Sequence, residues 1–159
     1  MTLVDILLFI AILGTGIVAG AFFAFSTFVT QGIDRAGATE AARAMRGINV
    51  TAVRAPFMIA IFGTALIAVV LLVMAFTGQP AGATWWVIAG AALYLVGVVF
   101  VTGGANVPRN NRLAAVPETD AAALADAWQA FRPGWLAWNH VRTLTSTAAC
   151  LAFVLALVA

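Results

Sequence analysis

The chain has 159 residues, of which 64% are hydrophobic and only 9% are charged. Soluble domains carry about 25% charged residues, so this composition excludes an ordinary water-soluble fold and indicates an integral membrane protein. The net charge of +2 does not point to nucleic acid, because all eight basic residues are arginines beside apolar stretches, where membrane topology explains them. The single cysteine, Cys150, excludes an intrachain disulfide.

Four apolar stretches are long enough to cross a bilayer core about 30 Å thick at ~1.5 Å per helical residue. They are residues 6–29, 56–76, 85–103 and 134–159. The first is too long for a signal peptide and lacks its basic n-region, so we interpret it as a retained helix. The predicted fold class is an all-α membrane protein, a four-transmembrane-helix bundle that forms one transmembrane domain over residues 1–159.

The arginines predict how the bundle sits in the membrane. Four flank the first connection (Arg35, Arg43, Arg46, Arg54) and four lie in or beside the third (Arg109, Arg112, Arg132, Arg142). Cytoplasmic loops collect arginine, so both long connections are expected in the cytoplasm, with the N- and C-termini outside. Within them, residues 39–46 and 121–131 predict short interfacial helices, the second ended or bent by Pro133-Gly134.

Small residues predict where the helices approach one another. Gly16, Gly20 and Ala24 recur at four-residue spacing in the first span, and Gly90 and Gly97 occur in the third. Such residues let helix backbones approach closely in a membrane, where no hydrophobic effect drives helix association. The same small residues are also compatible with packing between copies of the chain in a homo-oligomer.

The fourth span carries a polar stripe that includes the only histidine. At 100° per residue, one face of about 120° holds six polar residues: Asn139, His140, Thr143, Ser146, Thr147 and Cys150. Unsatisfied polar groups are costly in hydrocarbon, so this face is expected to point into the bundle. Arg142 lies about 160° from His140 on this helical wheel, so it is expected to meet headgroups, Trp138 or a loop.

Two further polar segments are expected beside the stripe. Asn106-Val107-Pro108-Arg109-Asn110 predicts a turn that ends the third span near the start of the fourth. Asn49 and Arg54 immediately precede the second span, whose first turn contains Pro56. Three polar helix ends are therefore predicted to converge on one cytoplasmic-side pocket.

These motifs resemble those of the anthrone oxygenase-like membrane proteins. The resemblance covers nearly the whole chain in order. It rests on Gly47-Ile48-Asn49, on Asn106-Val107-Pro108-Arg109-Asn110, and on Trp138-Asn139-His140-Val141-Arg142-Thr143. It implies the oxidation of a planar apolar anthrone to a quinone with dioxygen. The motif residues that it implies are Asn106, Pro108, Asn110, Trp138, Asn139, His140 and Arg142.

With these residues the chemistry requires no cofactor other than dioxygen as co-substrate. We expect His140 to remove the acidic proton of the substrate, and Arg54 or Arg109 to stabilise the developing oxyanion. Eight residues complete the predicted substrate-binding set: Asn49, Asn106, Asn110, Trp135, Trp138, Asn139, Arg142 and Tyr94. Phe22, Phe23 and Phe25 could wall the pocket together with Tyr94.

Several alternatives remain open at this point. One histidine and one cysteine cannot complete a metal site, although His140 could ligate a haem axially. The tryptophans could simply anchor helices at the interface. The polar stripe could merely join helices, in a non-enzymatic module that binds quinone, haem or planar lipid, or in a structural subunit of a larger membrane complex. The lysine-free, alanine-rich composition favours a bacterial cytoplasmic (inner) membrane.

Overall fold

The computed structural model describes residues 1–78, 80 and 82–159, and over these residues it is all-helical. Its long apolar helical segments could each cross a membrane: Leu3–Asp34, Pro56–Phe76, Thr84–Ala114 and Ala121–Val158. The prediction of an all-α bundle of four apolar helices is confirmed, and the chain is a multi-pass membrane protein.

Three of the four segments are assembled from shorter elements. The first comprises α1 (Leu3–Ala24), the π-helical turn η1 (Phe25–Val29) and α2 (Thr30–Asp34), and α3 (Ala38–Ala52) follows it. The second comprises α4 (Ala55–Met58), η2 (Ile59–Gly63) and α5 (Thr64–Phe76). The third comprises α6 (Thr84–Tyr94), η3 (Leu95–Phe100), η4 (Thr102–Asn106) and α7 (Val107–Ala114), and the fourth is the single helix α8 (Ala121–Val158).

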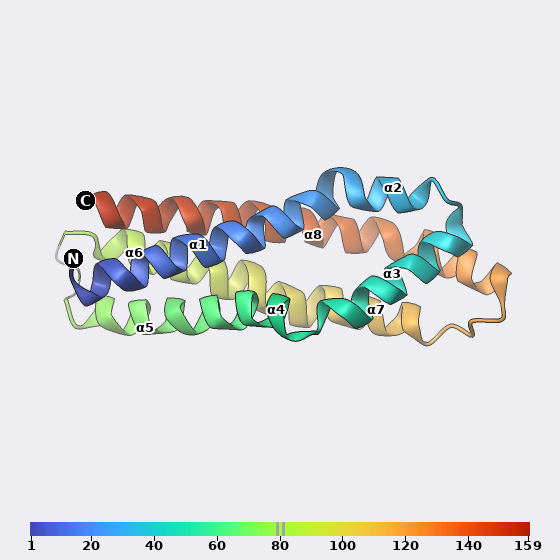
Figure 1. Ribbon diagram of the computed structural model, residues 1–159, viewed down its shortest axis with the longest axis horizontal. Coiled ribbons are helices and arrows are strands. Elements are labelled where there is room, and N and C mark those ends of the chain that lie inside the picture. The colour runs from blue at the N-terminus through green and yellow to red at the C-terminus, as the bar shows by residue number, and fades with distance from the viewer. Residues whose placement is uncertain (79, 81) are drawn as a thin grey trace.

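The four segments form a ring with two distinct ends. Helix α8 packs against α1 and α6, and α5 packs against the same two helices. Both chain termini lie at one end, which we call the terminal end (Figure 1). Helices α2, α3 and α7 lie at the other, which we call the arginine-rich end because both arginine-bearing connections are there (Figure 1). The assignment of this end to the cytoplasm stays a prediction.

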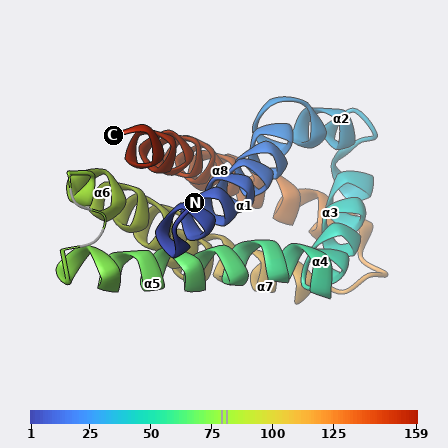
Figure 2. The same ribbon diagram turned by 60° about the vertical axis from the view of Figure 1, so that its left-hand side comes forward.

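Helix α3 crosses the arginine-rich end between α2 and α4 (Figure 2). Its apolar face packs on the start of α8, where Met45 is buried in one cluster with Leu124 and Trp128. The Trp128 indole N–H donates to Asp34 Oδ1 at 2.7 Å, which ties the end of the first segment to α8. Helix α3 is therefore held in place by tertiary packing, and its last turns lie over the interior of the bundle.

Two predicted helix boundaries are wrong. Helix α8 continues through Pro133 instead of ending there. Pro133 has no N–H group, so the backbone hydrogen bond to the Gln129 carbonyl is missing. Gln129 is exposed, and its carbonyl is therefore accessible to water. The predicted turn at Asn106–Pro108 is also helical, because the wider π-helical turn η4 precedes α7 and Pro108 sits in the first turn of α7, where a missing N–H costs little.

The interfacial helices also differ from the sequence prediction. Helix α3 is longer than the predicted 39–46 and begins after Gly37, whereas residues 121–131 form the first turns of α8 rather than a separate helix.

Glycines allow close helix approach at some of the predicted positions. A Cβ atom on Gly90 would lie 2.8 Å from the Phe153 ring, and one on Gly97 would lie 2.4 Å from Thr145. The close approach predicted at Gly20 is wrong, because no described atom of another helix lies within 4 Å of a Cβ placed there. Sequence spacing alone did not identify Gly14, where a Cβ would lie 2.0 Å from Thr64 Oγ1.

Candidate functional site

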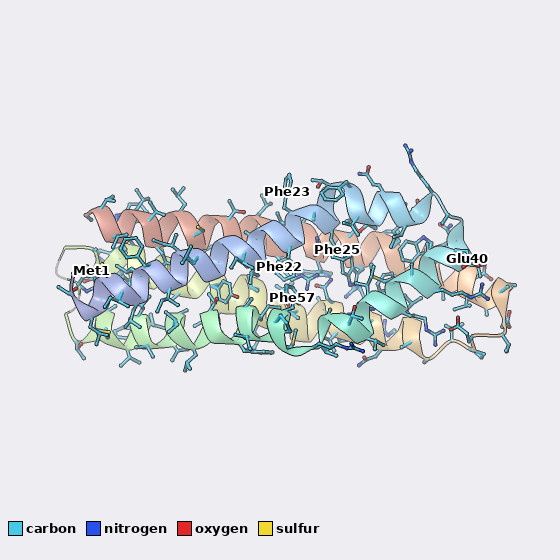
Figure 3. All side chains as sticks on the ribbon, in the orientation of Figure 1. Met1, Phe22, Phe23, Phe25, Glu40 and Phe57 are labelled. Atoms are coloured by element: carbon cyan, nitrogen blue, oxygen red, sulfur yellow. The ribbon has the colours of Figure 1, made fainter. Side chains whose placement is uncertain are left out.

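A cavity of about 190 Å³ lies inside the arginine-rich half of the bundle. Three of the aromatic side chains around it, Phe22, Phe25 and Phe57, lie between the helices, whereas Phe23 points away from the bundle (Figure 3). The lining comes from all four segments and α3: Ala21, Phe22, Phe25, Ile48, Asn49, Ala52, Val53, Phe57, Met58, Ile61, Phe62, Thr102, Val107, Asn110, Trp135, Asn139 and Arg142.

The polar side of this cavity is built around Arg142, whose residue is only 5% exposed. Its Nη2 donates to Asn139 Oδ1 at 2.7 Å, and its Nη1 donates to Thr102 Oγ1 at 3.3 Å. The guanidinium carbon lies 4.2 Å from the centroid of the Phe22 ring and 5.4 Å from that of Trp135. Arg142 therefore occupies one fixed position, stacked on aromatic faces that favour a cation.

Asn139 holds Arg142 in that position. The Asn139 Nδ2 group donates to the Phe22 carbonyl at 2.8 Å and to Ser26 Oγ at 2.8 Å, so both donor bonds go to the first segment. Its Oδ1 is left to accept from Arg142. Because the amide is fully buried and bonded at both ends, it fixes the orientation of the guanidinium relative to the cavity.

The site contains hydrogen-bond donors without a protein acceptor. Asn49 Nδ2 and Arg142 Nε are buried and have no partner among the described residues, and both residues line the cavity. Arg142 also forms no ion pair with any residue that the structure describes. Burying an uncompensated cation and an unpaired amide is unfavourable. The arrangement therefore suits a ligand that brings an oxygen acceptor, above all an anionic one.

Irregular helical turns surround this cavity. Lining residues come from three π-helical turns: Phe25 from η1, Ile61 from η2 and Thr102 from η4. Side-chain hydroxyls satisfy carbonyls in two of these turns, since Thr30 Oγ1 donates to the Phe25 carbonyl at 2.7 Å and the Tyr94 hydroxyl donates to the Ile61 carbonyl at 3.1 Å. Such turns are rare and occur frequently at functional sites.

The structure brings together five of the predicted substrate-binding residues. Asn49, Asn110, Trp135, Asn139 and Arg142 all line the cavity. The Trp135 indole N–H donates to Asn110 Oδ1 at 2.9 Å, which sets the angle of the indole ring beside Arg142.

Asn106 lies behind this group. It is buried and donates from Nδ2 to the Trp135 carbonyl at 3.2 Å, without lining the cavity. The predicted convergence of three polar helix ends is thus found, although its residues differ in part from those expected.

Other predicted residues lie elsewhere. The expectation that His140 points inward and Arg142 outward is wrong: His140 is exposed, whereas Arg142 is buried. Because Asn139 and Arg142 are three residues apart, they share one helix face, and His140 is rotated about 100° from Asn139. Arg54 is exposed, and neither it nor Arg109 lines the cavity.

The two predicted aromatic residues Tyr94 and Trp138 are also outside the lining. Tyr94 is fully buried in the bundle core, whereas Trp138 is 40% exposed. Of the predicted aromatic walls, Phe22 and Phe25 are found and Phe23 is not. Sequence reasoning missed Phe57 and Thr102. The three-residue spacing of Asn139 and Arg142 was the sequence signal that could have placed Arg142 inside.

The described residues offer little for a metal. Within residues 1–78, 80 and 82–159, no group of three or more His, Cys, Asp or Glu side chains is arranged to hold a metal ion. The haem alternative would require His140, which lies outside the cavity on the exposed side of α8.

Comparison with known families identifies the chain. The family model described as anthrone oxygenase matches residues 55–152, which is more than half of the chain and includes Asn110, Asn139 and Arg142. The chain therefore belongs to the anthrone oxygenase family, and the resemblance seen in its motifs is confirmed. A comparison with curated proteins and one with solved structures found no match.

Proposed function

We propose that the cavity binds a planar, apolar, anthrone-like molecule and promotes its oxidation to a quinone by dioxygen. The observation that carries this proposal is the buried Arg142 guanidinium, which faces an aromatic-walled cavity and has no ion pair among the described residues. Membership of the anthrone oxygenase family supports the same reaction class.

The reaction needs charge stabilisation more than covalent assistance. An anthrone loses one proton from its central methylene and becomes an anion with much of its charge on oxygen. This anion reduces dioxygen and combines with it to give a peroxide at the central carbon, and loss of water leaves a carbonyl there. The sum is anthrone plus dioxygen giving anthraquinone plus water. A preorganised cation at the anionic oxygen lowers the barrier to the first step.

Arg142 supplies that cation in the proposed site. Asn139 and the Phe22 ring fix the guanidinium before substrate arrives, so little reorganisation is required when the anion forms. The unpartnered Asn49 amide provides a second donor for a substrate oxygen. Asn110 and Trp135, which also line the cavity, keep their predicted role as substrate-binding residues in this proposal.

The proton is proposed to leave to water rather than to His140. Among the described lining residues there is no carboxylate and no imidazole, and Arg142 is their only ionisable group. An anion stabilised by Arg142 forms more readily, so a weak base such as water suffices. The proposal therefore does not use His140 as the base or Arg54 and Arg109 as oxyanion-stabilising groups, although the sequence led us to expect these roles.

The volume and the aromatic walls of the cavity favour a small flat ligand. Its volume of about 190 Å³ lies below the ~300–1,000 Å³ of typical drug-sized sites. Phe22 and Phe57 pack edge to face, with ring centroids 6.1 Å apart, and offer aromatic surface to a planar ring system. A flat apolar substrate also partitions into the bilayer. For the whole protein we propose a bacterial cytoplasmic membrane, with the arginine-rich end in the cytoplasm.

The test is oxygen uptake by the purified full-length protein in detergent, given a simple anthrone and corrected for spontaneous oxidation. Replacing Arg142 by Gln removes the charge, and we expect the enzymatic rate to fall by about 100-fold or more. His140→Gln is the matched control from the same motif, and it is expected to keep wild-type uptake. Equal rates for wild type and Arg142→Gln would contradict the proposal.

A second candidate is a non-catalytic module that binds a quinone or another planar oxygen-bearing lipid. The absence of a proton-accepting side chain from the described lining favours it. In this case the anthrone would bind to the wild-type protein, but its oxidation would be no faster than the background.

A further inference from the structure

A second cavity, separate from the one proposed to bind substrate, lies between α7 and α8 at the arginine-rich end. Its volume is about 310 Å³, and its lining includes Arg109, Arg112, Leu113, Phe131 and Gly134. No lining residue is shared with the first cavity. Two cations and an apolar wall in one groove indicate a ligand that is both anionic and lipophilic.

The two arginines are available to a ligand. They are three residues apart on α7 and therefore lie on the same helix face. Arg109 Nη1 donates to the Ala105 carbonyl at 2.7 Å, which anchors one side of the guanidinium, and Arg112 is exposed. Neither arginine forms an ion pair with the part of the chain that the structure describes.

Three other arginines at the same end are paired with carboxylates. Arg43 and Arg46 both pair with Glu118, and Arg132 pairs with Asp34 at 3.5 Å. Arg35 and Arg54 are exposed and, like Arg109 and Arg112, form no ion pair with a described residue, but they lie outside the groove. Asp126 is the α8 carboxylate nearest in sequence to the groove, and it pairs with neither Arg109 nor Arg112. The positive charge in the groove therefore has no described counterion.

A glycine on α8 makes room for one of these cations. A Cβ placed on Gly134 would lie 3.0 Å from Arg109 Nε, so the guanidinium occupies the space that a larger residue would fill. Trp138 is one helical turn further along the same face and is 40% exposed. The cationic groove thus continues into exposed aromatic surface.

The depth of the groove matches the level of lipid headgroups. A bilayer core takes about 20 helical residues, so counting from Thr84, where α6 begins at the terminal end, places the other boundary near Gly104. Arg109, whose side chain lies beside Gly134, is then about 7 Å beyond the core at ~1.5 Å per residue. Trp138 is one helical turn closer to the core than Gly134, near the boundary, where amphipathic aromatic rings are enriched.

We propose that the α7–α8 groove binds the phosphate of an anionic phospholipid, with Arg109 and Arg112 as its cations. The glycerol region then lies towards Trp138, and the acyl chains follow the exposed apolar surface of the bundle. Basic pockets between membrane helices are suited to such headgroups. A free phosphate ion would use the arginines but would gain nothing from Leu113, Phe131 or Trp138.

The experiment is native mass spectrometry of the full chain titrated with phosphatidylglycerol or with zwitterionic phosphatidylcholine. The variant Arg109→Gln/Arg112→Gln is compared with Arg35→Gln/Arg54→Gln, which removes two exposed arginines at the same end but outside the groove. We expect wild type and the control pair to prefer phosphatidylglycerol, and the groove variant to bind it roughly tenfold more weakly. Elution volume and helical circular dichroism verify the fold of each variant.

A second variant keeps the test decisive if the double variant misfolds. Arg112 is exposed, so Arg112→Gln alone should fold and still weaken phosphatidylglycerol binding, whereas Arg112→Lys should largely restore it. Equal loss in the groove and control pairs, or no preference over phosphatidylcholine, would overturn the proposal. So would inorganic phosphate displacing phosphatidylglycerol completely at millimolar concentration, because this would identify a free-anion site.

Discussion

The two halves of the bundle have different interiors. Towards the terminal end, regular helices enclose a solid cluster that includes Leu8, Leu71 and Phe153, each no more than 1% exposed. Towards the arginine-rich end, π-helical turns and the Arg142–Asn139 pair surround a cavity. Hydrophobic helices therefore fill their interior unless local backbone irregularity and fixed polar groups hold it open.

The largest difference between the halves should appear when an aromatic side chain is truncated in each. Phe153→Ala removes a fully buried ring packed against Gly90, and we expect it to cost about 3–5 kcal/mol of unfolding free energy. Phe57→Ala should cost clearly less, because that ring already borders empty space. Equilibrium unfolding in mixed micelles measures both. Equal costs would mean that the two halves are equally well packed.

A smaller effect should follow from adding one methyl group at a close contact. Gly90→Ala places a Cβ against the Phe153 ring, and we expect a loss of about 1–3 kcal/mol from the forced repacking. Gly20→Ala is the matched control, since no described atom of another helix lies within 4 Å of its Cβ, and helix propensity should make it neutral or slightly stabilising. The melting temperatures of the two variants report this contrast. A Gly90→Ala variant as stable as wild type would contradict this prediction.

The smallest effect is expected at the boundary between the halves. Tyr94→Phe removes the hydroxyl that satisfies the Ile61 carbonyl in η2, and we expect a loss of about 0.5–1 kcal/mol. Because η2 borders the cavity, ligand affinity should change together with stability. If the variant loses stability but binds ligand with unchanged affinity, η2 does not influence ligand binding in the cavity.

Much of the fold could be predicted from the sequence. Hydropathy alone gives four spans, because a bilayer imposes a minimum apolar length on each. The helix boundaries near Pro108 and Pro133 could not be predicted in the same way. Proline usually ends a helix, but here η4 and an exposed carbonyl accommodate it. Such compensation depends on tertiary surroundings that a local pattern does not contain.

The site was only partly predictable for a related reason. The motif Trp138–Arg142 identifies a segment that lines the cavity, yet helix rotation decides which of its side chains face inward. The sequence favours His140 as the base, but the structure buries its neighbour Asn139 together with Arg142. Burial of an arginine at the edge of the hydrocarbon core contradicts the usual preference of that residue for water. Its partners, Thr102 and Phe22, come from other segments.

The central claim is that Arg142 stabilises an anionic oxygen inside the cavity. The most direct measurement uses a hydroxyanthraquinone, which is already at the quinone oxidation level and whose phenolate absorbs at longer wavelength than its phenol. A pH titration of the ligand bound to the wild-type protein should give a phenol pKa about one unit or more below the pKa of the same ligand in empty detergent micelles. Arg142→Gln should abolish that decrease. An unchanged or raised ligand pKa in the wild-type protein would contradict the account.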